Sequence, residues 1–190
     1  MTTRDRILDC AIAELEANGL EGLSLRAAGV KAGVTPMAVY RHFHDKADLL
    51  RAVGEHALDQ WQKRVAAVTA AGLREWFRAV TEASVAFALD EPALYDAAFV
   101  LKTRAERVYP EDFRAGRSPV IGLLAAKLAE AQGAGAVRTG DPLELAMGIW
   151  GVLHGLIGLY RSGRFSLSRE EFTALCLRSA ARMVTTGDVG

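Results

Sequence analysis

Residues Leu23–Lys46, which read LSLRAAGVKAGVTPMAVYRHFHDK, decide the fold of the N-terminal part of this chain. Ser24 can cap a short helix over about 25–32, because its hydroxyl can accept from the free N–H groups of the first turn. Gly33 ends that helix, since glycine readily adopts the left-handed conformation found after helix C-termini. The first half of the stretch therefore predicts one short helix and a tight turn.

A second short helix is expected to follow, running to about Phe43. Thr35 offers a hydroxyl cap and Pro36 suits the first helical position, which is the order found at helix starts. Two short helices joined in this way are typical of a helix-turn-helix, whose second helix enters the DNA major groove. Small, polar and basic residues remain on its outer side as candidate DNA contacts: Thr35, Pro36, Met37, Ala38, Tyr40, Arg41 and His42.

The overall charge does not by itself indicate a nucleic-acid partner. The formal net charge of the chain is +0 at pH 7. Basic and acidic residues also balance over residues 1–46, but their arrangement is uneven. Between Ser24 and Lys46 there are four basic residues, and Asp45 is the single acidic one. This local excess of positive charge favours contact with phosphates.

The rest of the chain predicts an all-α protein of about nine helices, because Ala, Leu, Glu and Arg dominate and apolar residues recur at helical spacing. We expect an N-terminal helix-turn-helix domain over 1–47 and a helical-bundle body over 48–190. The remaining helices are expected at about 3–17, from Lys46 onward, and at 73–89, 92–108, 119–131, 142–160 and 169–184. Residues 109–117 are expected to form a polar loop, and 132–140 a mobile glycine-rich loop.

The N-terminal pattern resembles the DNA-binding head of the TetR (tetracycline-repressor-like) family. The residues that carry the resemblance are Leu23–Ala28 and Ala32–Leu50, within a match of roughly residues 5–51. The resemblance implies that Tyr40 and His42 contact the groove and phosphates and that Lys46 anchors a phosphate. It also implies phosphate or base contacts for Arg26 and Thr35, and a role in sequence preference for Pro36, Met37 and Ala38.

Two features bear on how far the resemblance extends. Gly29 and Val30 depart from the family pattern, which has a small residue such as alanine and then a polar one, so the first short helix is expected to be less rigid. The stretch Trp150–Leu156, WGVLHGL, is similar to a tryptophan–histidine–glycine signature in the ligand-binding body of one branch of the family. We expect a repressor that a small hydrophobic effector releases from its operator.

An apolar pocket in the body is the expected effector site. Ligand pockets are lined mainly by apolar and aromatic side chains with few polar groups, although such residues at helical spacing also form ordinary cores. His154 on an apolar face has the same alternative, a core histidine that is hydrogen-bonded. The candidate lining residues are Trp76, Phe77, Val80, Phe87, Tyr95, Phe99, Leu124, Leu128, Trp150 and His154.

A row of glycines in the expected 142–160 helix suggests close helix packing. Gly148, Gly151, Gly155 and Gly158 lie on one narrow stripe, and glycines let two backbones approach. The partner can be the 169–184 helix of the same chain or a helix of a second copy. Apolar residues of the 169–184 helix, Phe172, Leu175 and Met183, are expected to join the glycines in a homodimer interface.

Other functional classes receive less support. Cys10 and Cys176 lack neighbours at metal-ligand spacing, and no nucleophile arrangement or phosphate loop is visible, so we expect no enzyme, metal or cofactor. The apolar run Leu145–Tyr160 has 16 residues, fewer than the roughly 20 that span a bilayer. A cytoplasmic protein without membrane contact is therefore expected. The alternative function is a helical ligand-binding or scaffold protein that does not bind DNA.

Overall fold

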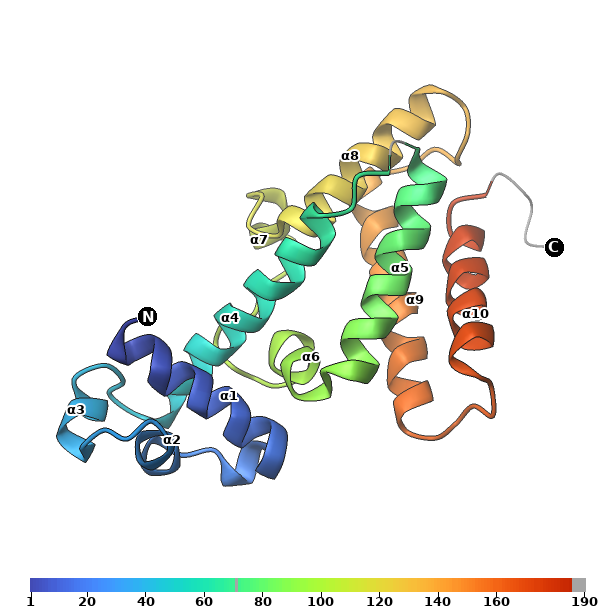
Figure 1. Ribbon diagram of the computed structural model, residues 1–190. Coiled ribbons are helices and arrows are strands. Elements are labelled where there is room, and N and C mark those ends of the chain that lie inside the picture. The colour runs from blue at the N-terminus through green and yellow to red at the C-terminus, as the bar shows by residue number, and fades with distance from the viewer. Residues whose placement is uncertain (71, 186–190) are drawn as a thin grey trace. The chain divides into compact units, whose positions relative to one another are not determined.

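A computed structural model describes residues 1–70 and 72–185 of the protein (Figure 1). The described residues form ten helices and no strand, which confirms the expected all-α class. The helices are α1 (Thr3–Gly22), α2 (Leu25–Lys31), α3 (Pro36–Tyr40), α4 (Lys46–Ala66), α5 (Leu73–Asp90), α6 (Pro92–Phe99), α7 (Glu111–Arg114), α8 (Pro119–Gly133), α9 (Pro142–Arg161) and α10 (Arg169–Arg182).

Contacts between residues divide the chain into two compact units. The first contains Met1–Trp61 and Phe87–Glu106, and the second contains Gln62–Ala86 and the chain from Arg107 onward. Helices α4 and α5 each contribute residues to both units. This division differs from the expected boundary after residue 47, because much of α4 and all of α6 group with the N-terminal helices.

The first unit is built on α1, which packs against α2 and α6, while α2 packs against α3. The apolar side of α1 is buried through Ile7, Ala11 and Leu15, at the spacing of successive helical turns. Phe43 is fully buried just after α3. Burying such side chains stabilises the short helices, which would be marginal on their own.

Four aromatic rings fill another part of the first unit. Trp61 stacks on Phe87 with 6.0 Å between ring centroids, and Tyr95 meets Phe99 edge-on at 5.2 Å. Edge-on and offset contacts of this kind are the favourable geometries for aromatic pairs. The four rings come from α4, α5 and α6 and bring the ends of these helices together.

Helix α6 ends at Phe99, so the expectation of a helix to about residue 108 is wrong. The last turn closes when the Leu101 N–H donates to the Asp96 carbonyl at 2.7 Å, one residue beyond the α-helical spacing. Thr103 is then buried against Gly54 of α4, where a Cβ would lie 2.7 Å from the Thr103 Cβ. A tertiary contact with a glycine, which local sequence does not reveal, therefore ends the helix early.

Two further boundaries differ from expectation. Helix α1 continues to Gly22 rather than ending near Ala17, but Gly19 interrupts it with φ 66° and ψ −171°. The expected left-handed glycine is thus present, and a helical turn resumes after it. The expected loop over 109–117 contains the short helix α7, because Phe113 turns inward and is buried.

The second unit is organised around α9, which packs against α8 on one side and α10 on the other. Asp141 caps α9 through its carboxylate, which accepts from the Leu143 N–H at 2.8 Å. Ser168 and Glu171 cap α10 by the expected reciprocal pair of hydrogen bonds. Ile149, Leu153 and Ile157 of α9 are buried at helical spacing and form the centre of this unit.

Candidate nucleic-acid interface and ligand pocket

The turn between α2 and α3 has the local bonds expected of a helix-turn-helix. The Ser24 hydroxyl accepts from the Ala27 N–H at 3.1 Å, and the Thr35 hydroxyl accepts from the Ala38 N–H at 3.3 Å. Gly33 lies between the helices with φ 65°, a conformation that costs glycine little and other residues much. The predicted caps and turn are confirmed at each of these positions.

The contact between α2 and α3 explains why position 29 is a glycine, which departs from the family pattern. It is buried on α2, and a Cβ built there would lie 2.6 Å from Cγ2 of Val39 on α3. Glycine therefore lets the two helices approach more closely than any side chain would. The expectation of a less rigid α2 considered only the intrinsic helix propensity and not this contact. Nothing in the structure explains Val30, whose side chain is 75% exposed.

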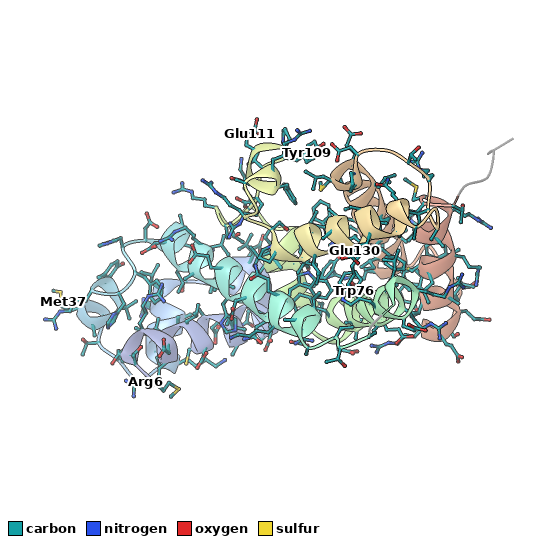
Figure 2. All side chains as sticks on the ribbon, turned by 90° about the horizontal axis from the view of Figure 1, so that it is seen from above. Arg6, Met37, Trp76, Tyr109, Glu111 and Glu130 are labelled. Atoms are coloured by element: carbon teal, nitrogen blue, oxygen red, sulfur yellow. The ribbon has the colours of Figure 1, made fainter. Side chains whose placement is uncertain are left out.

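The candidate DNA contacts reach solvent. Met37 is 69% exposed and Tyr40 is 56% exposed, both on α3, and Figure 2 shows Met37 directed away from the helices behind it. Ala38 is half-buried, and the remaining candidates are exposed: Arg26, Thr35, Pro36, Arg41, His42 and Lys46. Apolar Met37 and an aromatic ring exposed beside basic residues give a surface that can contact both bases and phosphates.

Lys46 lies at the first turn of α4, as expected. Its ammonium group donates to the Leu20 carbonyl at 2.9 Å, so the side chain is tied to the end of α1 while remaining exposed. The Arg4 guanidinium lies 5.0 Å from the centroid of the Phe43 ring. Both cations are therefore positioned by contacts within the first unit rather than free in solvent.

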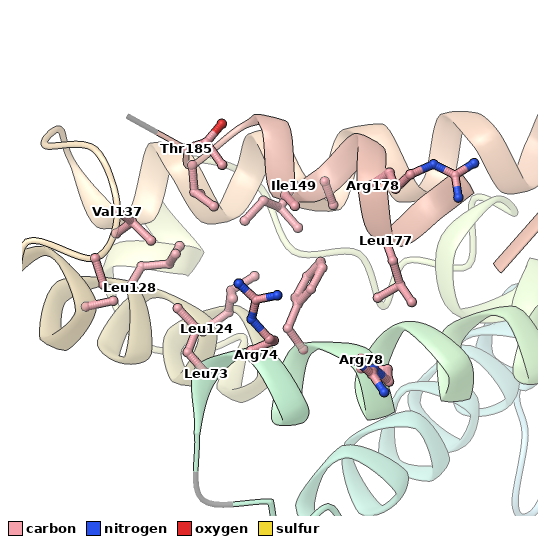
Figure 3. A pocket seen from close by; sticks show the side chains of 16 residues that line it. Leu73, Arg74, Arg78, Leu124, Leu128, Val137, Ile149, Leu177, Arg178 and Thr185 are labelled. Atoms are coloured by element: carbon pink, nitrogen blue, oxygen red, sulfur yellow. The ribbon is translucent and has the colours of Figure 1, made fainter. Parts of the chain in front are cut away.

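The second unit contains a pocket of about 530 Å³. Its walls come from α5, α8, α9, α10 and the segments next to them, and Figure 3 shows the side chains that line it. The residues that line it are Leu73, Arg74, Phe77, Arg78, Leu124, Leu128, Ala131, Ala136, Val137, Ile149, Leu177, Arg178, Ala180, Ala181, Val184 and Thr185.

The ten residues predicted to line a pocket fall into three groups. Phe77, Leu124 and Leu128 line the pocket of the second unit. Trp76 and Val80 are buried beside it on α5, and Trp76 lies under the Lys127 ammonium at 5.4 Å from the ring centroid. The other five lie elsewhere: Phe87, Tyr95 and Phe99 in the aromatic cluster of the first unit, and Trp150 and His154 on α9.

His154 packs against the Trp150 ring at 4.7 Å between ring centroids, and Trp150 in turn meets Phe113. Burial disfavours the charged imidazolium and lowers the pKa of His154 to about 4. The ring is therefore neutral at physiological pH. His154 is half-buried by its exposed surface, and its role, whether in the core or in ligand binding, stays a prediction.

The pocket residues that the sequence did not predict fall into two groups. Arg74 and Arg78 are four residues apart on α5 and so lie on the same side of the helix, a signal that was available in the sequence. Arg178 and the small residues of α10 carried no such signal, because they lie about one hundred residues away along the chain. Their place in the wall depends on how the helices pack.

The segment between α8 and α9 is held in place rather than loosely attached. The Arg138 N–H donates to the Val184 carbonyl at 2.9 Å, and its guanidinium Nε donates to the Met183 carbonyl at 2.8 Å. The Gln132 side chain also donates to the carbonyls of Arg138 and Gly140. The segment was expected to be mobile, but these bonds join it to the end of α10 and make Ala136 and Val137 an end wall of the pocket.

The glycine stripe of α9 is mostly open. A Cβ built on Gly148 would meet the Met183 side chain at 2.9 Å, so this glycine packs against α10 of the same chain. At Gly151, Gly155 and Gly158 a Cβ would meet nothing within 4 Å. The four glycines thus have two different environments. One lies in a contact within the chain, and the other three form an uncovered surface.

Helix α9 is the one helix in 1–70 and 72–185 that is long and apolar enough to cross a membrane, judged by length and composition alone. The apolar run of 16 residues was expected to be too short, but the helix that contains it has 20 residues. Length therefore does not exclude a span. The same test is passed by core helices of water-soluble proteins, and several α9 residues are buried against α8 and α10.

Two family models match the chain. The model described as the tetracyclin repressor-like C-terminal domain matches residues 77–185, which is more than half of the chain. The model described as bacterial regulatory proteins of the tetR family matches residues 7–53, the region that contains α2 and α3. The two matches together cover the helix-turn-helix and all pocket-lining residues except Leu73 and Arg74.

Individual relatives are similar over different extents. The HTH-type transcriptional regulator SrpR of Pseudomonas putida is 45% identical over 51 residues, which are 27% of this chain and 24% of that protein. The chain thus spans about a quarter of the length of this curated relative. A solved structure from Rhodococcus sp. RHA1, described as a protein with unknown function, is 26% identical with a TM-score of 0.81, covering 98% of this chain and 97% of that one.

A second similar structure is AibR in complex with isovaleryl coenzyme A and operator DNA. It is 18% identical with a TM-score of 0.67 and covers 94% of this chain and 97% of that chain. At this identity the likeness concerns the fold.

Proposed function

The chain belongs to the TetR family of bacterial regulatory proteins, and from this premise we propose that it is a DNA-binding transcriptional repressor released from its operator by a small effector. The observation that carries the proposal is the exposed side of α3, where Tyr40 and Met37 stand out from a unit whose core is otherwise closed. An exposed aromatic ring and an exposed methionine on a helix of five residues serve no purpose in packing that unit.

The proposed division of labour on this surface follows the chemistry of each residue. Tyr40, Arg41 and His42 donate hydrogen bonds to phosphates and base edges, and Lys46 neutralises a phosphate beside the start of α4. Arg26 and Thr35 extend these contacts from α2 and from the cap of α3. Pro36, Met37 and Ala38 lack charge and set base preference through apolar contacts and close approach.

We propose that two copies associate through α9 and α10. Gly151, Gly155 and Gly158 present an open surface without side chains, which suits the close approach of another helix. A twofold dimer would place two α3 helices on two DNA half-sites about 34 Å apart. Phe172 is buried within its own chain, so Leu175 and Met183, which are half-buried, are the α10 residues that remain for such a contact.

In this proposal the effector binds the body of the protein, the chain is no enzyme, and it works in the cytoplasm without membrane contact. The pocket of the second unit supports an effector site, because its volume and apolar walls are those of small-molecule sites. The AibR structure, which contains isovaleryl coenzyme A and operator DNA, supports the view that this fold can accommodate both kinds of partner.

A DNA-shift assay on the intergenic DNA upstream of the gene tests the proposal. The wild-type chain should retard this DNA, and Tyr40→Ala and His42→Ala should each weaken binding about fivefold or more, since single groove contacts contribute roughly 1–3 kcal/mol. Tyr109→Ala is the matched control, because Tyr109 is a 40% exposed tyrosine outside the helix-turn-helix.

The alternative is a helical ligand-binding protein that does not bind DNA, which the balanced charge of residues 1–46 favours. Binding of a ligand without any shift of upstream or randomised DNA would establish this alternative and overturn the repressor proposal. Equal retardation by wild type, Tyr40→Ala and His42→Ala would instead contradict the assigned DNA surface.

A further inference from the structure

The border of the pocket in the second unit carries three positive charges and no negative one. Arg74 and Arg78 of α5 and Arg178 of α10 line the pocket and are exposed, and no Asp or Glu is among the lining residues (Figure 3). None of the three arginines takes part in an ion pair within the part of the chain that the structure describes. Among the described residues, none neutralises these three charges through an ion pair.

The two arginines of α5 carry like charges close to each other. Arg74 and Arg78 are four residues apart on the helix, a spacing at which like charges repel each other. Elsewhere the chain pairs its cations locally, as between Lys31 and Glu14 at 3.1 Å and between Arg117 and Asp112 at 2.8 Å. The three pocket arginines thus differ from these paired cations in forming no ion pair with any residue that the structure describes.

The interior of the same pocket is apolar. Leu124 and Leu128 of α8 are buried and form its floor, and Ile149 of α9, which is also buried, lines it from another helix. Val137, held by the bonds of Arg138 to the end of α10, closes one end. At about 530 Å³ the pocket lies within the roughly 300–1,000 Å³ of small-molecule sites. It can therefore enclose an apolar body but offers that body few hydrogen bonds.

We propose that this pocket binds an amphiphilic carboxylate, whose aliphatic or aromatic body lies on the apolar floor and whose carboxylate pairs with the arginines at the border. Guanidinium groups pair with carboxylates through parallel hydrogen bonds, and three such groups on two helices can select an anion over a neutral molecule. The inference rests on the proposed function, because it names the chemical class of the effector. It replaces the neutral hydrophobic compound expected from the aromatic residues of the sequence.

Calorimetric titration of the full chain without DNA tests the inference, with octanoate, 1-octanol and octylamine as probes of equal chain length. Octanoate should bind more tightly than 1-octanol, and octylamine more weakly than either. Arg74→Gln, Arg78→Gln and Arg178→Gln should each weaken octanoate binding about two- to fivefold, as expected for exposed ion pairs. The triple variant should weaken it at least about tenfold, whereas 1-octanol binding should stay unchanged.

Two control variants show whether octanoate binding depends on the pocket arginines in particular and whether it takes place inside the pocket. Arg182→Gln removes an exposed arginine of α10 that does not line the pocket, so octanoate binding should remain as in wild type. Ala136→Trp fills the pocket from an exposed position of the end wall and should abolish binding of octanoate and 1-octanol alike. Octanoate binding that is unchanged in the triple arginine variant, or in Ala136→Trp, would overturn the inference.

The inference and the proposed function can fail separately. If octanoate binds as described but never releases the shifted DNA, the pocket assignment stands and the effector role of the site fails. If neutral compounds release the DNA equally from wild type and from the triple arginine variant, the repressor proposal stands and the anionic class is wrong.

Discussion

Gly29 of α2 and Val39 of α3 lie so close that a Cβ on the glycine would be 2.6 Å from the valine Cγ2. Val39 is 2% exposed and β-branched, so its side chain has little freedom to turn away. The spacing of the two helices in the helix-turn-helix therefore depends on the missing side chain at position 29.

Replacing Gly29 by alanine should destabilise the chain despite the better helix propensity of alanine. Overpacking costs about 1–3 kcal/mol, which exceeds the gain of roughly 1 kcal/mol from propensity. Denaturant unfolding should show a lower midpoint for Gly29→Ala. In a Val39→Ala background, where the methyl group that meets position 29 is absent, Gly29→Ala should lower the midpoint less. Gly122→Ala on α8 is the control, because a Cβ there meets nothing within 4 Å and should stabilise the helix. A Gly29→Ala protein as stable as wild type would contradict the close contact.

Lys46 should contribute one phosphate contact to the proposed DNA complex. Lys46→Gln should lower the slope of log K against log salt by about 1, because one counterion fewer is released on binding. Lys31→Gln is the matched control, since the Lys31 ammonium is already paired with the Glu14 carboxylate at 3.1 Å. Binding measured by fluorescence anisotropy at several salt concentrations gives both slopes. An equal change in the two variants would remove Lys46 from the assigned contacts.

The open glycines of α9 should be tolerated by the isolated chain but not by the proposed dimer. Gly155→Leu places its side chain where the monomer has nothing within 4 Å, so the thermal midpoint of the monomer should change little apart from the gain in helix propensity. Sedimentation should show a shift from dimer to monomer. Gly148→Leu provides the contrast, because it would collide with Met183 of its own chain and lower the stability itself. A Gly155→Leu protein that remains dimeric would place the interface elsewhere.

His154 should make the stability of the protein depend on pH. Its pKa is lowered to about 4 in the folded chain by burial, while the unfolded chain has the ordinary value of 6.5. Below pH 6.5 the unfolded state binds the extra proton, so the free energy of unfolding should fall as the pH drops from 7 toward 5. The loss should be on the order of 2 kcal/mol by pH 5, and His154→Gln should remove it.

The stabilities of wild type and His154→Gln should be compared between pH 7.5 and 5. The carboxylates of Asp5, Asp48 and Asp112 have lowered pKa values through hydrogen bonds with neighbouring residues, and their stabilisation is lost only at lower pH. His44→Gln is the control, because His44 is exposed. Urea unfolding followed by circular dichroism gives the free energies. The same pH slope in wild type and His154→Gln would show that another group is responsible.

Several features could be read from the sequence because they depend on residues within one helical turn of each other. Ser24, Thr35, Asp141 and Ser168 cap their helices as expected, since a side chain next to a helix start reaches N–H groups two or three residues on. The register of the TetR pattern from Leu23 to Leu50 likewise indicated the helix-turn-helix. These capping hydrogen bonds depend little on the rest of the fold, so local sequence determines them.

Tertiary packing decided the features that join residues far apart in the chain. Phe99 ends α6 because Thr103 finds space at Gly54, and Arg74 and Arg178 border one pocket because α5 and α10 both contribute to its walls in the second unit. The aromatic residues predicted to share a pocket separate into two units, since apolar spacing marks the inward side of a helix but not which helix it meets. The sequence thus determined most of the helices and the family. The location of the pocket and its charge arose from helix packing, which depends on contacts between residues that no local pattern relates.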